Sequence, residues 1–160
     1  MRFSHSKPVR ILLALVAAGT LAASLSACSQ IVSLDAAPDS NNPRCAAVSV
    51  RLPDAIDGMS QRDTDAQATS AWGTPTRVIF RCGLPEVKAS TLTCVTAGGV
   101  DWLVDDTQAP NYRFITFGRN PASEVIVDSD HASGVKALEG VAQAIQDGIP
   151  SDRLCTEPKS

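Results

Sequence analysis

The chain has 160 residues, and its 14 basic and 17 acidic side chains give a net charge of −3. Three of the basic residues precede Cys28, so the part that follows has 11 basic against 17 acidic side chains, a net charge of −6. Nucleic acids and anionic bilayer surfaces repel such a protein. Aromatic residues make up only 4% of the chain, so surfaces for stacking bases are scarce too. We therefore expect no nucleic-acid partner.

The first 27 residues have the three parts of a bacterial lipoprotein signal peptide. A start with three basic residues precedes an uncharged apolar stretch at residues 11–25, and Ser26-Ala27 lead to Cys28. The stretch is too short and too rich in alanine for a spanning helix, which needs about 20 apolar residues. An ordinary cleaved signal peptide is the alternative, but a leucine three positions before the cysteine favours lipidation. We expect diacylation of Cys28, and two acyl chains suffice for stable anchoring.

Residues 28–44 are predicted to be a flexible tether. They are rich in Ser, Asp, Asn and Pro and have no sustained periodicity, so they cannot bury enough apolar surface to offset their ordering entropy. A coil of this length reaches about 20–25 Å. Residues 45–155 follow as a single folded domain by length, and residues 156–160 form a tail.

Four cysteines remain after Cys28, and an even number in an exported chain indicates two disulfides. They are Cys45, Cys82, Cys94 and Cys155. Three pairings are open. We favour Cys82–Cys94, which closes a local loop, and Cys45–Cys155, which joins the two ends of the domain. With one histidine after Cys28, these residues lack the ligand spacing of a metal centre, and we expect no metal or cofactor.

The order of the predicted elements is β, α, several β, then α. A short strand at 48–52 precedes an alanine-rich helix at 63–72, which glycine and proline end. Strands follow at 77–81, 92–97, 100–105, 112–117 and 124–128. The last helix, at 133–147, has one apolar face, and Ser129 or Asp130 is its expected cap. The order predicts a small two-layer α+β domain with a mostly antiparallel sheet and helices on one face.

Gly98-Gly99 predicts a two-residue hairpin turn with a defined register. The facing pairs are then Ala97 with Val100, Val95 with Trp102, and Thr93 with Val104. One face then carries Val95, Ala97, Val100, Trp102 and Val104. We expect it to be the core face, and Trp102 is then a core residue. Cys94 falls on the other face.

Four arginines on the predicted strands are the candidate binding residues, together with Asp101. They are Arg77, Arg81, Arg113 and Arg119. Guanidinium groups bind carboxylates and phosphates bidentately, so these side chains could form a cationic patch for peptidoglycan stems or anionic envelope polymers. Gly118 would let a ligand or a loop approach Arg119 closely. The alternative is that these arginines pair with Asp101, Glu124 and Asp128 across an exposed sheet face.

His131 is the one histidine that a nucleophilic site after Cys28 could use. It lies in the stretch Asp128-Ser129-Asp130-His131, which reads as the start of a helix rather than as a catalytic group. Asp105 and Asp106 precede a polar turn and read as solvated loop residues. We therefore expect no catalytic residues.

Several short segments, in order and spacing, resemble a known family. They are Leu52-Pro53, Ala71-Trp72-Gly73-Thr74-Pro75, Arg81-Cys82-Gly83, Gly99-Val100-Asp101-Trp102-Leu103 and Thr116-Phe117-Gly118-Arg119. They resemble actinobacterial exported proteins grouped as domain of unknown function 3515, over nearly all of residues 45–155. The resemblance implies an envelope location and a high-GC Gram-positive source, with which ten arginines against four lysines agree. It carries over no catalytic residue.

Together these observations predict a lipid-anchored protein on the extracytoplasmic face of the cell membrane. We expect it to be non-enzymatic and to bind an envelope protein or a peptidoglycan-related component of the cell wall. The alternative is an envelope hydrolase or another enzyme that uses carboxylates and arginines.

Replacing Cys28 by alanine should leave an unprocessed precursor or release the protein into the medium, because thioether acylation requires the thiol. Partitioning of the wild-type protein between detergent and water is the measurement, and we expect it in the detergent phase. A wild-type protein that is cleaved elsewhere and stays in the aqueous phase would contradict lipidation.

Overall fold

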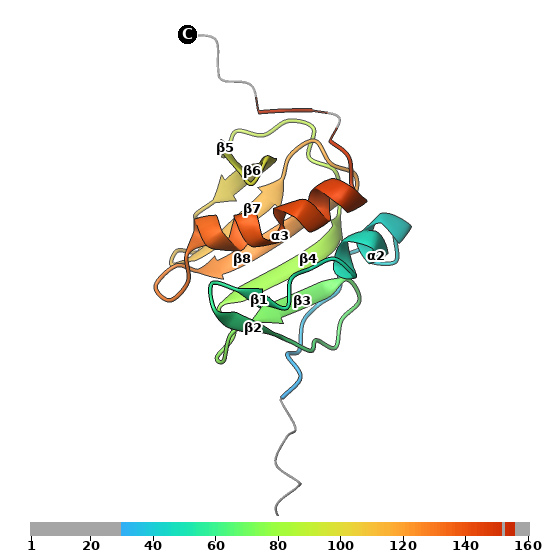
Figure 1. Cartoon of the computed structure of the whole chain (residues 1–160). Helices are drawn as coiled ribbons and strands as arrows, with labels where there is room; N and C mark the ends of the chain where they lie inside the picture. Colours follow the sequence, from blue (N-terminus) through green and yellow to red (C-terminus); the bar gives the residue numbers. More distant parts are fainter. Residues whose placement is uncertain (1–29, 152, 156–160) are drawn as a thin grey trace, which may run out of the picture. The chain divides into compact units, whose positions relative to one another are not determined.

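The computed structural model describes residues 30–151 and 153–155, so the predicted signal peptide, Cys28 and the predicted tail lie outside the described residues. The contacts between residues divide the chain into two units, of which the second begins at Ile31. The fold of this second unit is as follows. Its eight-stranded sheet has the order β1-β2-β3-β4-β8-β7-β6-β5, with antiparallel neighbours throughout, and two helices pack against it (Figure 1). The elements are α2 (Pro43–Ser49), β1 (Ala55–Ile56), β2 (Met59–Arg62), β3 (Thr69–Trp72), β4 (Val78–Leu84), β5 (Thr93–Ala97), β6 (Val100–Asp105), β7 (Asn111–Thr116), β8 (Ala122–Asp128) and α3 (Gly134–Gly148). The predicted α+β class and antiparallel sheet are confirmed.

The hairpin of β5 and β6 has the predicted register. Ala97 faces Val100, Val95 faces Trp102, and Thr93 faces Val104. Val100 and Trp102 are fully buried, whereas Val95 stays 37% exposed because β5 is an edge strand.

The predicted last helix is confirmed as α3, but its expected cap is wrong. The N-cap is Ser133, whose side chain accepts a hydrogen bond from the Lys136 amide. The amide of Asp130 instead donates to the side chain of Asp128, in the turn that precedes the helix. Serine is a favoured cap because its oxygen satisfies an amide that the first turn leaves unpaired.

Two predicted elements before β4 are wrong. The strand expected at 48–52 is the end of α2 and a turn, because Asn42 caps this helix and Pro43 occupies its first turn. The helix expected at 63–72 is a turn followed by β3. Ala68 has the positive φ of 54°, which no right-handed helix tolerates, and Thr69 pairs with Arg81 of β4. Sheet pairing overrides the helix propensity of the three alanines.

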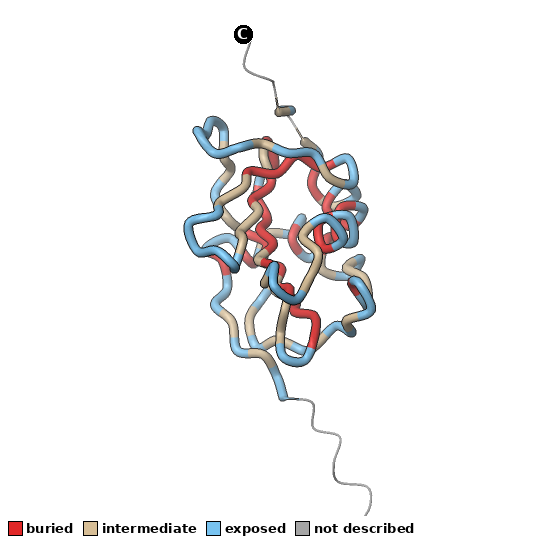
Figure 2. Tube along the Cα trace, turned by 90° about the vertical axis from the view of Figure 1, so that its left-hand side faces the viewer, coloured by how far each residue is buried: buried red, intermediate tan, exposed pale blue. Residues whose placement is uncertain are grey.

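The core lies between α3 and one face of the sheet, where buried segments run along the strands and the facing side of the helix (Figure 2). Its largest side chains come from both layers: Trp72, Phe80 and Trp102 from the sheet and Ile145 from α3. Among the described residues, neither helix has the length and apolarity needed to cross a membrane.

Residues 31–44 do not form the expected tether. The amide of Val32 donates to Asp63 and its carbonyl accepts from Asp65, and the amide of Asp39 donates to Gly83. Gly83 has a φ of 110°, and a Cβ there would lie 2.5 Å from the Ser40 nitrogen, so glycine is what allows this segment to cross β4. The folded unit therefore begins well before the boundary predicted at residue 45.

The predicted disulfide pairing is also wrong. The bonds are Cys45–Cys82, with Cα atoms 5.5 Å apart, and Cys94–Cys155, with Cα atoms 6.0 Å apart. Cys82 points into the core, toward α2, whereas Cys94 lies on the opposite face of the sheet. The two cannot meet, because β8, β7 and β6 lie between their strands and their side chains lie on opposite faces of the sheet.

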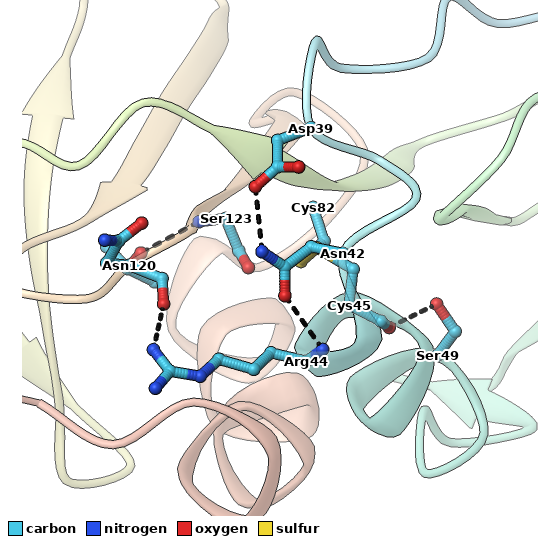
Figure 3. Close-up of a disulfide and its surroundings, with 9 residues drawn as sticks. Asp39, Asn42, Arg44, Cys45, Ser49, Cys82, Asn120 and Ser123 are labelled. Atoms are coloured by element: carbon cyan, nitrogen blue, oxygen red, sulfur yellow. Dashed lines mark hydrogen bonds between the residues drawn. A yellow bond between two sulfur atoms is a disulfide. The ribbon is translucent and has the colours of Figure 1, made fainter.

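The first disulfide fixes the N-terminal segment to the sheet (Figure 3). Around it, the Asn42 side-chain amide donates to Asp39 over 2.8 Å, and Arg44 donates to the Asn120 carbonyl over 2.5 Å. Helix α2 is thus held by a covalent bond to β4 and by the contact of Arg44 to the loop before β8.

Replacing Trp102 by alanine should lower the free energy of unfolding by about 3–5 kcal/mol, as removal of a fully buried large side chain does. The matched control is Val95→Ala, at the facing position on the exposed edge, which should cost about 1 kcal/mol or less. Urea unfolding with both disulfides intact measures the difference. Equal losses for the two variants would contradict the burial of Trp102 in the core.

Candidate functional site

Three of the four candidate arginines pair with carboxylates on the sheet face opposite α3. Arg77 contacts Asp128 at 2.5 Å, and the Arg81 Nε atom donates to Glu124 over 2.6 Å. Arg113 bonds to the other oxygen of Glu124, whose side chain is only 1% exposed. The ion-paired alternative therefore describes these arginines, and their charges are neutralised within the sheet.

Asp128 joins the start of α3 to this network. Burial alone would raise its pKa, but hydrogen bonds and charge from Arg77 and His131 outweigh that effect, so the pKa of Asp128 lies below its ordinary value. The His131 Nδ1 atom lies 2.9 Å from the carboxylate. This arrangement orders the turn before the helix and agrees with the structural interpretation of His131.

Arg119 is not on an exposed sheet face. It is 5% exposed, its Nη1 atom donates to the Ile149 carbonyl, and its backbone bridges Ser151. Burial lowers the pKa of Arg119, and the charge of Asp101 opposes that effect. Gly118 does allow a close approach, but what approaches is the protein's own C-terminal segment: a Cβ there would lie 2.6 Å from the Arg153 carbonyl oxygen.

Asp101 has a similar structural position. It is 8% exposed, and its carboxylate accepts hydrogen bonds from the Thr96 hydroxyl over 2.6 Å and from the Cys155 amide over 2.7 Å. Arg119 and Asp101 thus hold the C-terminal segment from two sides. The Cys94–Cys155 disulfide supplies the third attachment.

A groove of about 730 Å³ lies beside this disulfide. The residues that line it carry no charged side chain: Ala89, Ser90, Thr91, Leu92, Thr93, Cys94, Thr96, Leu103, Phe117 and Cys155. Leu103 and Phe117 belong to an apolar cluster on the sheet face opposite α3, and serine and threonine hydroxyls surround them. None of the five predicted binding residues lines the groove. A smaller polar cavity of about 280 Å³ lies beside Gln61 and Thr64.

Sequence reasoning missed the groove because it treated the face opposite the core as solvated. Leu103 shares that face with Cys94, and an apolar residue at such a position was the available signal. Leu103 is 3% exposed and packs with Ile115 and Ala122. Leu84 and Val87 from the end of β4 and the loop beyond it complete this second cluster.

Within residues 30–151 and 153–155, no group of three or more His, Cys, Asp or Glu side chains could hold a metal ion. The groove is a neutral concave surface, and it lies on the same side of the sheet as the ion-paired arginines. Such a surface can bind an uncharged group that has both apolar and hydrogen-bonding parts.

Comparison with known proteins gives a family and no relatives of established function. The family described as "Protein of unknown function (DUF3515)" matches residues 7–154, and the chain belongs to this family. No curated protein and no solved structure matches.

Replacing Arg119 by alanine should lower the free energy of unfolding by about 2–5 kcal/mol, because it leaves a cavity and removes a donor from the Ile149 carbonyl. Arg51→Ala is the matched control: Arg51 is exposed and its side chain donates to the nearby Ala47 carbonyl, so its loss should cost less than about 0.5 kcal/mol. Thermal melts compare the two. If Arg119→Ala melts like Arg51→Ala, Arg119 has no structural role.

Proposed function

We propose that this member of the DUF3515 family is a lipid-anchored binding protein on the extracytoplasmic face of the cell membrane. Cys28 carries the acyl chains, and the groove beside Cys94–Cys155 holds a segment of an envelope protein or a component of the cell wall. The groove is the single observation that carries the binding role.

Two features support the location. The first 28 residues have the charge, apolar length and small residues of a lipoprotein signal that ends at the acylated cysteine. The four cysteines that follow form two disulfides, which persist in oxidising compartments outside the cytoplasm. An exported protein has access to both a membrane partner and the cell wall.

The chemistry of the groove favours an uncharged ligand. A volume of about 730 Å³ lies in the range typical of small-molecule sites, roughly 300–1,000 Å³. Leu92, Leu103 and Phe117 offer apolar contact, and the hydroxyls of Ser90 and Thr91 can bond to amide or sugar groups. A neutral peptide segment or a glycan has this combination of groups, whereas a polyanion would meet no cation in the lining.

The position of the charged residues supports binding rather than catalysis. A catalytic carboxylate or base has to reach a bound substrate. Glu124 is held between Arg81 and Arg113, and Asp101 is occupied by Thr96 and by the Cys155 amide. None of these charged groups lines the groove.

Replacing Leu92 by glutamate should abolish ligand capture, because it places an unpaired charge in a neutral groove. The matched control is Val135→Glu: Val135 is 60% exposed on α3, which packs on the opposite face of the sheet. The lipidated proteins would be incubated with membrane extract and with purified peptidoglycan fragments, and captured material identified by mass spectrometry.

We expect capture by the wild-type protein and by Val135→Glu but not by Leu92→Glu. Equal capture by both variants, with unchanged thermal melts, would contradict the groove as the binding site. No capture by the wild-type protein from either source would contradict the proposed function.

A further inference from the structure

The segment between the predicted acylation site and the folded unit is short. Ile31 is three residues after Cys28, and three extended residues span at most about 11 Å. A flexible tether of residues 28–44 would have allowed about 20–25 Å. This difference matters because a short link restricts which side of the domain can face the membrane.

Residues 31–44 are attached to the rest of the unit from Val32 onward. Val32 forms an isolated parallel bridge with Thr64, and the Leu34 amide donates to the Asp65 carboxylate over 2.9 Å. Hydrogen bonds from Leu34 and Ser33 hold the pKa of Asp65 below its ordinary value. Further along, the Arg81 side chain donates to the Asp35 carbonyl over 3.3 Å. The segment therefore cannot lengthen the link unless these contacts break.

The two ends of the described unit carry different features. The start of the described chain, drawn in blue, lies at the lower end in Figure 1, and the loop before β5 and residues 153–155 lie at the upper end. The groove belongs to the upper end, because residues 89–92 and Cys155 line it. A compact domain of this length is roughly 30 Å across.

We propose that the end of the domain around Ile31, Val32 and Asp63 is held directly against the lipid bilayer, and that the groove faces away from it. This inference rests on the proposed acylation of Cys28. Ile31 is 63% exposed and has an apolar side chain that suits the bilayer boundary. Asp63 and Asp65, both exposed, would be repelled by anionic headgroups, so the acyl chains and the short link hold this face in place.

The orientation leaves the groove accessible to ligands from the cell-wall side. A groove at the membrane-facing end would be blocked by the bilayer, and one at the end of a long tether could face any direction. The contacts of residues 31–44 therefore have a functional consequence: they fix the direction in which the groove opens.

Energy transfer to a headgroup-labelled lipid tests this orientation. The acylated protein would carry a donor fluorophore at Asp63→Cys or at Ser90→Cys, both exposed positions, in phosphatidylcholine vesicles with a labelled acceptor lipid. We expect severalfold stronger transfer from position 63 than from position 90. Inserting about 20 glycine and serine residues between Gln30 and Ile31 adds a coil that reaches about 25 Å, and the difference should then nearly disappear.

Mass spectrometry of the N-terminal peptide separates two kinds of failure. If Cys28 is acylated and positions 63 and 90 transfer equally, or position 90 transfers more, the orientation is overturned while the anchored binding role stands. If Cys28 carries no acyl chain, the proposed anchoring is overturned, and the orientation with it. An unchanged difference after the insertion would show that the short link does not set the orientation, and would overturn the inference.

Discussion

The Cys45–Cys82 bond is the constraint on which the arrangement of the layers depends. Both cysteines are fully buried, and the bond joins α2 to β4 in the middle of the core. With a sequence separation of 37 between its ends, it lowers the entropy of the unfolded chain by an amount equivalent to about 3–4 kcal/mol in the loop-closure account. Helix α2 then packs closely on α3, where a Cβ at Gly148 would lie 2.5 Å from a Val48 methyl group. Gly148 at the end of α3 allows this close packing, and Gly83 beside Cys82 allows the segment before α2 to approach β4.

The sheet buries parts of both faces, and this explains why the charged residues have structural roles. On a fully solvated sheet face, cross-strand ion pairs would contribute little to the stability of the fold. Here Glu124 is buried between two guanidinium groups, so removing either arginine would leave a buried carboxylate with fewer partners. The loop beyond β4 covers the neighbouring apolar cluster, and the groove forms where this cover ends.

The parts of the fold that were predicted from sequence are those set by local patterns. The Gly98-Gly99 turn fixes the hairpin register by itself, and the apolar face of α3 is repeated over four turns. The elements that were wrong depend on distant partners. Residues 69–72 form a strand because β4 pairs with them, and residues 31–44 are ordered because Gly83 and Asp65 provide bonds that composition does not reveal. The predicted disulfide pairing was wrong for the same reason, although strand alternation indicates that Cys82 and Cys94 lie on opposite faces of the sheet.

Two of the predicted binding residues instead hold the C-terminal segment that reaches the groove. Asp101 and Arg119 attach the C-terminal segment from two sides, and the disulfide of Cys155 fixes its end beside Cys94. Cys155 then lines the groove. A buried carboxylate and a buried guanidinium are expensive to place in a protein interior unless they are compensated. Here the Asp101 carboxylate is compensated by the Thr96 hydroxyl and the Cys155 amide. The Arg119 guanidinium is compensated by the Ile149 carbonyl and by the charge of Asp101.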